Sequence, residues 1–193
     1  SLIFALKRKH YKTNKEFHYL RWNVIPESRI CVIIPAYKEE PVIEKIVNDY
    51  LNKNNVIQVL VIDNHSTDKT ADIAEKCGAK VIRKEKNTGY ANSCVTGLKE
   101  SLNTNANIIV LTEADGTFDG RDLSKMIPYL ENVDMVIGTR EIQVLSEKGN
   151  QNKMFYVWGN FLLAKLLQIK YFSLLHMGVV SLTDVGCAYR CIR

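Results

Sequence analysis

From residue 30 onward, short runs of apolar, largely β-branched residues alternate with segments whose apolar residues recur at helical spacing. The runs predict five strands, and the segments between them predict four helices. The expected strands are 29–37, 56–63, 79–84, 106–115 and 133–140, and the expected helices are 39–51, 66–77, 88–102 and 119–130. Ser66 or Thr67 is the expected N-cap of the second helix, because a hydroxyl there can accept a hydrogen bond from the first turn.

This alternation indicates the α/β class, with helices in two layers around a largely parallel central sheet. The first strand is apolar at nearly every position, which is typical of a strand buried on both faces. Open sheets of this kind bind ligands beyond the carboxyl ends of their strands. We therefore expect functional residues directly after each strand.

The two ends of the chain depart from this pattern. Residues 1–29 are polar, basic and aromatic without a clear period, and they predict an N-terminal arm or a peripheral helix. Residues 30–147 form the expected α/β core, and residues 148–193 form an apolar, amphipathic segment. Two lysines interrupt the apolar stretch of this last segment well before the ~20 residues that a membrane-spanning helix needs. The stretch suits either a helix on a membrane surface or a helix packed on the sheet.

Composition and charge limit the possible partners. The chain has 193 residues, of which 46% are hydrophobic and 24% charged, so collagen-like, coiled-coil and disordered classes are excluded. The net charge of +5 is unevenly spread. Residues 1–30 carry seven basic and two acidic side chains, and residues 148–193 carry six basic and one acidic side chain. The middle of the chain, residues 31–147, carries 13 basic and 18 acidic side chains. An acidic middle argues against a nucleic-acid partner. Either the surface is uneven by chance, or the two basic ends face an anionic membrane.

Other sequence signals narrow the function and location further. The five cysteines are odd in number and form no CxxC pair, which favours reduced thiols in a cytoplasmic protein and no zinc site. The N-terminus lacks the apolar stretch and cleavage site of a signal peptide. The sequence also lacks GxGxxG after the first strand, GxxxxGK[ST] and GxSxG, so a nicotinamide dehydrogenase, a P-loop NTPase and an α/β-hydrolase are not expected.

The triplet Glu113-Ala114-Asp115 suggests a metal site at the end of the fourth strand. Side chains two residues apart in an extended segment point the same way, so the two carboxylates repel each other unless a cation lies between them and an anion. Mg²⁺ or Mn²⁺, held by one or two carboxylates and a substrate diphosphate, is a common solution. Acidic pairs are frequent, however, and this triplet alone does not identify the ligand.

Six motifs, in this order, carry a resemblance to a known family: VIIPAYKEE, VLVIDNHSTDKTADIA, NTGYANSCVTGL, LTEADGTF, IGTR and LTDVGCAYR. They resemble family 2 of the inverting glycosyltransferases, closest to the branch that makes dolichyl- or polyprenyl-phosphate mannose or glucose. The resemblance covers residues 30–193 and implies a three-layer, Rossmann-like GT-A fold with a largely parallel central sheet. Family members usually continue beyond the last motif, so the resemblance also implies a longer chain, with room for a membrane anchor.

The resemblance also implies roles for individual residues. The donor would be a UDP- or GDP-sugar, the cofactor a divalent cation (Mg²⁺ or Mn²⁺), and the acceptor a polyprenyl or dolichyl phosphate at the cytoplasmic face of a membrane. Asp115 and Glu113 would hold the metal, with Glu113 also near the ribose, and Arg140 and Arg190 would bind phosphate. Asp184 would lie near the sugar or acceptor and act as the base for a hydroxyl acceptor. The remaining substrate-binding residues would be Pro35, Ala36, Tyr37, Glu39 and Asp63, the last against the base.

Three positions depart from the family pattern. Lys38 stands where Asn is usual, Asn64 replaces the second Asp of DDxSTD, and Glu113 replaces the first Asp of DxD. These departures leave donor affinity and the choice of metal open, and Asn64 and Glu113 make a non-catalytic interpretation possible. Two alternatives therefore stand beside a polyprenyl-phosphate transferase. One is a transferase that extends a cell-surface polysaccharide or glycan, and the other is a non-catalytic subunit that binds nucleotide sugars.

Overall fold

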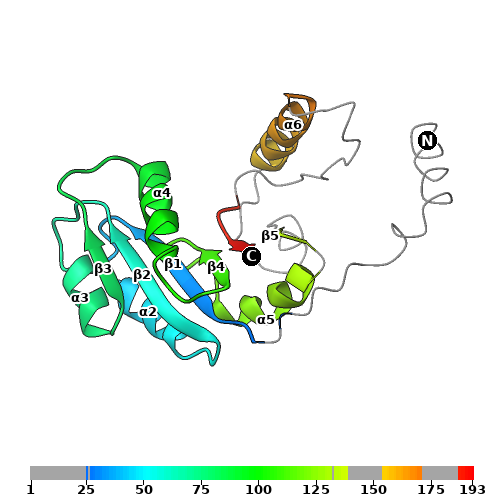
Figure 1. The fold of residues 1–193 in the computed structure, drawn as a ribbon. Coiled ribbons are helices and arrows are strands. Elements are labelled where there is room, and N and C mark those ends of the chain that lie inside the picture. The colour runs from blue at the N-terminus through cyan, green and yellow to red at the C-terminus, as the bar shows by residue number, and fades with distance from the viewer. Residues whose placement is uncertain (1–24, 26, 132, 139–153, 171–186) are drawn as a thin grey trace, which may run out of the picture.

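The computed structural model describes residues 25, 27–131, 133–138, 154–170 and 187–193. Within these ranges one sheet has the strand order β3-β2-β1-β4-β6-β5 (Figure 1). The strands are β1 (Ile30–Ala36), β2 (Val56–Asp63), β3 (Lys80–Arg83), β4 (Ile108–Leu111), β5 (Met135–Ile137) and β6 (Arg190–Ile192). The helices are α2 (Ile43–Leu51), α3 (Thr70–Lys76), α4 (Tyr90–Ser101), α5 (Leu123–Met126) and α6 (Met154–Lys170), with 3₁₀ turns η2 (Gly120–Asp122) and η3 (Ile127–Glu131).

Strand β1 lies at the centre of the sheet and pairs in parallel with β2 and β4, while β2 pairs in parallel with β3. All seven residues of β1 are buried. Val32 and Ile34 belong to the core under α2 and α3, whereas Cys31 and Ile33 belong to the smaller core under α4. The three-layer, largely parallel α/β fold predicted from the sequence is confirmed, and Figure 1 shows α4 across the strands from α2 and α3.

The contact between α4 and the sheet depends on a glycine. A Cβ at Gly97 would lie 2.3 Å from Ile33 Cγ2 and 3.2 Å from Ile62 Cγ1, both in the sheet. Atoms this close overlap, so only glycine lets α4 approach β1 and β2 at this distance. This approach brings the start of α4 to the carboxyl ends of the strands.

Two of the sequence expectations differ from the structure on the β4 side. Strand β6, which was not expected, inserts antiparallel between β4 and β5. The helix expected over 119–130 is divided into η2, α5 and η3. Pro128 accounts for the second break, because proline lacks an N–H and its ring clashes with the carbonyl group four residues earlier.

The expected N-cap at Ser66 or Thr67 is wrong. Helix α3 begins at Thr70, and Lys69 occupies the N-cap position without a side-chain hydrogen bond to the helix. The Ser66 hydroxyl instead accepts a hydrogen bond from the Lys38 N–H at 3.0 Å, which ties the loop after β2 to the loop after β1. The local signal for a helix start is therefore used for a contact between loops.

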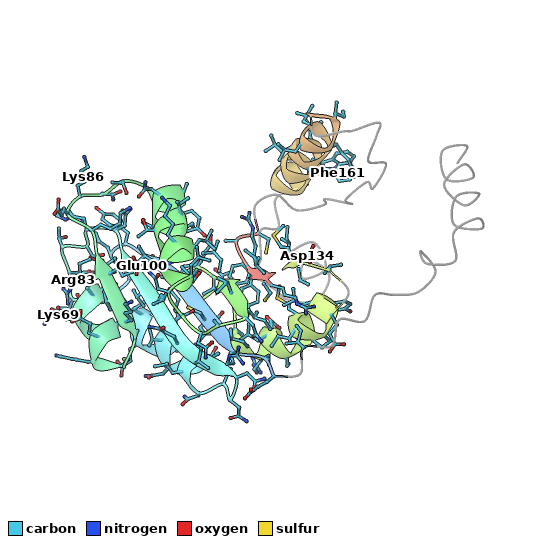
Figure 2. The ribbon with its side chains drawn as sticks, in the orientation of Figure 1. Lys69, Arg83, Lys86, Glu100, Asp134 and Phe161 are labelled. Carbon is cyan, nitrogen blue, oxygen red and sulfur yellow. The ribbon has the colours of Figure 1, made fainter. Side chains whose placement is uncertain are left out.

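The ends of the chain are described only in part. Ile25 packs against the larger core, and the N–H of Arg29 donates to Asn107 Oδ1 at 2.7 Å. Helix α6 includes Phe161 (Figure 2), and most of the large apolar side chains that the structure describes in it are exposed, Trp158 at 66% among them. No helix in the described ranges is long and apolar enough to cross a membrane. Most of the predicted arm 1–29 lies outside the described residues.

Candidate active site

A cleft of about 410 Å³ opens at the carboxyl ends of the parallel strands. Its walls come from the segments that follow β1, β2, β3 and β4 and from the start of α4. The lining residues are Pro35, Ala36, Tyr37, Glu39, Asn64, Asn87, Gly89, Tyr90, Ser93, Glu113, Ala114 and Asp115. The cleft lies where an open parallel sheet binds its ligands.

The segment after β1 forms the middle of the cleft. It turns sharply, since Lys38 has a left-handed backbone with φ of 59°. Side-chain oxygens of the neighbouring loop hold this turn: the Glu39 N–H donates to Thr70 Oγ1 at 2.9 Å, and the Lys38 N–H donates to Ser66. A non-glycine residue keeps such a backbone only where its surroundings enforce it. The turn brings Tyr37 and Glu39 to the cleft wall.

The segment after β2 is held largely by its own carboxylates. Asp63 is 4% exposed, and both its oxygens accept a hydrogen bond from the Ser66 N–H at 3.3 Å. Asp68 accepts from Thr70 Oγ1 at 2.6 Å and from the Thr70 N–H at 3.1 Å. Partial burial alone would raise the pKa of Asp68, but these hydrogen bonds outweigh it and lower that pKa. Asp63 does not line the cleft, so its expected contact with a base stays a prediction.

The segment after β4 supplies the acidic end of the cleft. Glu113 and Asp115 both line it, and Asp115 Oδ1 accepts a hydrogen bond from the Thr117 N–H at 2.9 Å across Gly116, which has φ of 79°. Partial burial raises the pKa of Glu39, and the negative charges of Asp115 and Asp68 raise it further. The structure thus gathers carboxylates from three loops close enough to repel one another.

The position of Arg190 extends the site toward β6. Its backbone pairs with Leu111 of β4 and Ile137 of β5, and its Nε is buried without a hydrogen-bond partner in the described part of the chain. Burial raises the pKa of Tyr90, with Cys94 and Glu113 acting in the same direction and the positive charge of Arg190 opposing them. Arg190 is therefore in electrostatic reach of the cleft wall. The other predicted phosphate ligand, Arg140, and the predicted base, Asp184, lie outside the described residues.

Besides Asn64, five cleft residues were not predicted individually: Ala114, which lies between Glu113 and Asp115, and Asn87, Gly89, Tyr90 and Ser93. The last four belong to the segment NTGYANS, which is part of one of the six motifs and follows the strand predicted over 79–84. Asn64 was noted only as a departure from the family pattern, yet it lines the cleft too. Position after a strand points to the segments that hold these residues, but it does not single out Asn64 or Asn87 within them.

The donor atoms of the acidic end suit a hard divalent cation. Carboxylate oxygens are ligands that Mg²⁺ and Mn²⁺ prefer, and one or two of them suffice when a diphosphate supplies the rest. Among the described residues, no group of three or more His, Cys, Asp and Glu side chains is arranged to hold a metal ion. Glu113 and Asp115 therefore fit a site that a bound diphosphate completes, rather than a closed metal site.

Comparison with known proteins gives the family. The sequence model described as glycosyl transferase family 2 matches residues 31–188. An uncharacterized protein of Methanocaldococcus jannaschii is 37% identical over 120 residues, which cover 61% of this chain and 49% of that protein. The UDP-N-acetylglucosamine–dolichyl-phosphate N-acetylglucosaminyltransferase of Methanococcus voltae is 32% identical over 130 residues, which cover 58% of this chain and 51% of the enzyme. The chain thus spans about half the length of these relatives.

A solved structure supports the fold. Glucosyl-3-phosphoglycerate synthase from Mycobacterium tuberculosis, in complex with Mn²⁺, UDP and glucosyl-3-phosphoglycerate, superimposes with a TM-score of 0.59 at 21% identity. The superposition covers 86% of this chain and 56% of the synthase. At this identity the likeness concerns the fold alone.

Proposed function

Because the chain belongs to glycosyl transferase family 2, we propose that it transfers a sugar from a UDP- or GDP-sugar to a polyprenyl or dolichyl phosphate, with inversion at the anomeric carbon. The family and the GT-A type of fold agree with the resemblance found in the sequence. The observation that carries the proposal is the cleft at the strand ends, with carboxylates at the β4 end and apolar and amide groups at the other end. The relative from Methanococcus voltae, named for a dolichyl-phosphate acceptor, supports the acceptor class.

The acidic end would hold the diphosphate of the donor through a divalent cation. Asp115 is the main proposed metal ligand, with Glu113 as the second. When bound, a Mg²⁺ or Mn²⁺ ion supplies Lewis-acid stabilisation of the charge that develops on the leaving diphosphate. Pro35, Ala36, Tyr37, Glu39 and Asp63 are the proposed contacts to the nucleotide, and all but Asp63 line the cleft.

The acceptor would enter from the β6 side. A phosphate monoester is already anionic at neutral pH, so one of its oxygens can attack the anomeric carbon without a strong base. The new carbon–oxygen bond forms as the bond to the diphosphate breaks, and the nucleoside diphosphate leaves with the electron pair. Arg190 and Arg140 would orient the acceptor phosphate through charge-assisted hydrogen bonds. If the acceptor were a sugar hydroxyl, Asp184 would have to remove its proton.

A transfer assay tests this function. The chain is incubated with Mn²⁺ and labelled UDP- or GDP-sugars, together with either a polyprenyl phosphate or an oligosaccharide. We expect label in the lipid fraction and not in the oligosaccharide. Transfer to the oligosaccharide alone would favour the glycan-extending alternative, and donor binding without any transfer would favour the non-catalytic one.

Contact with a membrane surface is part of the proposal, because a polyprenyl acceptor resides in a membrane. Helix α6 leaves Leu162 60% and Ile169 71% exposed, and Lys165 lies over the Phe161 ring at 5.1 Å. Apolar side chains beside a lysine suit a helix at the headgroup level of the cytoplasmic leaflet. Co-sedimentation with liposomes should therefore increase with anionic lipid and decrease with salt. Binding indifferent to both would contradict this contact.

A further inference from the structure

The two ends of the cleft differ in chemistry, and the amide end has a geometry of its own. In the sheet, β1 separates β4, which Glu113 and Asp115 follow, from β2 and β3, which Asn64 and Asn87 follow. The β4 end is acidic. The opposite end presents uncharged amides beside the apolar surfaces of the β1 segment. A ligand with one charged and one neutral part would therefore lie along the cleft in a single direction.

A chain of hydrogen bonds fixes how the two amides are turned. The Gly89 N–H, which can only donate, bonds to Asn87 Oδ1 at 3.0 Å, and Asn64 Nδ2 donates to the same oxygen at 2.8 Å. Asn64 Oδ1 in turn accepts from the Thr88 N–H at 3.0 Å. Because backbone N–H groups stand at both ends of this chain, neither amide can be flipped without placing donor against donor. An aspartate at position 64 could not donate to Asn87.

The consequence is that Asn87 turns its NH₂ group outward. Both hydrogen bonds of its side chain within the described part of the chain use the oxygen, and no described residue accepts a hydrogen bond from Nδ2. Asn64 is 6% exposed and is held by the Ala36 carbonyl, which accepts from its N–H at 2.9 Å. A nearly buried amide thus holds an exposed one so that two donors are presented at the wall of the cleft.

We infer that Asn87, held by Asn64, recognises the base of the nucleotide donor and selects bases with a keto oxygen at the position of uracil O4 or guanine O6; this inference rests on the proposed function. An uncharged, planar base suits the amide end, while the diphosphate suits the acidic end. The Tyr37 ring, 43% exposed, also lines the cleft, and Lys38 Nζ lies over it at 5.4 Å from the ring centroid. Uracil O4 and guanine O6 accept hydrogen bonds, whereas cytosine and adenine carry an amino donor at the corresponding position. Asn87 is thus a specificity-determining residue that favours UDP and GDP over CDP and ADP.

Nucleotide binding to the complete 193-residue chain tests the inference. Affinities for UDP, CDP, GDP and ADP are measured by calorimetry in saturating Mn²⁺. We expect UDP to bind about tenfold more tightly than CDP, and GDP about tenfold more tightly than ADP, because a mismatched amino group leaves donors unpaired on both sides. Asn87→Asp keeps an oxygen for Gly89 and Asn64 but turns an acceptor outward, so both ratios should fall to about one or below.

The controls separate charge from recognition. Asn92→Asp adds the same charge in the first turn of α4, at a residue that does not line the cleft, and should leave both ratios unchanged. Asn64 lines the cleft too, so Asn64→Asp tests the pair of amides: its carboxylate cannot donate to Asn87 Oδ1 and repels this oxygen, and both ratios should fall. Binding without discrimination in the unmodified chain, or unchanged ratios in Asn87→Asp, would overturn the inference alone. Failure of all four nucleotides to bind would overturn the proposed function as well.

Discussion

The two sides of the cleft are built differently. On the β2 side, Asp68, Thr70 and Asn64 cross-link the loops after β1, β2 and β3 through hydrogen bonds of 2.6–3.0 Å. On the β4 side, Asp115 is exposed, and within the described residues its carboxylate accepts one hydrogen bond, from the nearby Thr117 N–H. The β2 side is therefore ordered by hydrogen bonds before a ligand arrives. The negative charge of Asp115 on the β4 side, together with that of Asp68 on the β2 side, raises the pKa of Glu39, so these carboxylates repel one another until positive charge is added.

This difference indicates that the two sides of the cleft contribute differently to ligand binding. A preorganised wall loses little freedom on binding and gives specificity, because a wrong ligand leaves its polar groups unpaired. A group of carboxylates that repel one another binds an anionic ligand weakly by itself. Its affinity for that ligand increases most when a cation binds together with the anion. Binding at the β4 side should then couple the metal to the diphosphate, while the β2 side recognises the rest of the nucleotide. Three substitutions test the two halves separately.

The largest effect is expected from Asp115→Asn on the β4 side. The substitution removes the main proposed metal ligand from a group that few other contacts support, so turnover should fall by about 100-fold or more at saturating donor and Mn²⁺. Initial rates of sugar transfer measure this. The control is Asp134→Asn, an exposed carboxylate next to β5 (Figure 2), which should retain its rate. Unchanged turnover in Asp115→Asn would contradict the proposal that carboxylates of the β4 side hold the metal ion.

The same contrast explains what the sequence could predict. The segments after β1 and β4 were identified because a buried apolar run ends at polar residues, and this pattern is local: Pro35, Ala36, Tyr37, Glu39, Glu113 and Asp115 do line the cleft. Asn87 could not be singled out, because its role depends on Asn64, which lies 23 residues earlier. Strand β6 escaped prediction for a similar reason. It has only three residues, and pairing with the distant β4 defines it.

Residue type also misled where a side chain had two possible partners. Ser66 precedes a helical segment, and its side chain is of a type that often caps helices. Its hydroxyl nevertheless accepts a hydrogen bond from the Lys38 N–H, and its own N–H donates to Asp63. Local propensity was overridden by the need to satisfy a strained turn in the neighbouring loop. The cleft is where such competition is expected, because functional sites depart from local rules more often than the core does.

A smaller effect, on stability rather than turnover, is expected from Thr70→Val on the β2 side. Thr70 is fully buried, donates to Asp68 and accepts from the Glu39 N–H. Valine therefore leaves the Glu39 N–H without this partner and removes the shortest of the hydrogen bonds to Asp68, which keeps those from the Thr70 and Glu40 N–H groups. The free energy of unfolding, measured by urea denaturation, should fall by about 1–3 kcal/mol. Thr70→Ser keeps the hydroxyl and should recover most of this loss. Equal destabilisation by both variants would mean that packing of the methyl group, and not the hydrogen bonds, holds the loops together.

The smallest effect concerns Glu39, which stands between the two sides. Partial burial and the charges of Asp115 and Asp68 raise its pKa above 4.5, so the folded protein holds the proton more tightly than the unfolded chain. The ionised carboxylate therefore destabilises the fold at pH values above the raised pKa, and this penalty disappears as the pH falls below 4.5. Glu39→Gln should raise the Tm slightly near neutral pH, and the gain should vanish in acid. In the Asp115→Asn background the gain should shrink, because one of the two repelling charges is gone. A gain that is independent of pH would show that the carboxylates of the cleft do not repel one another, and the contrast between its two sides would then lose its electrostatic basis.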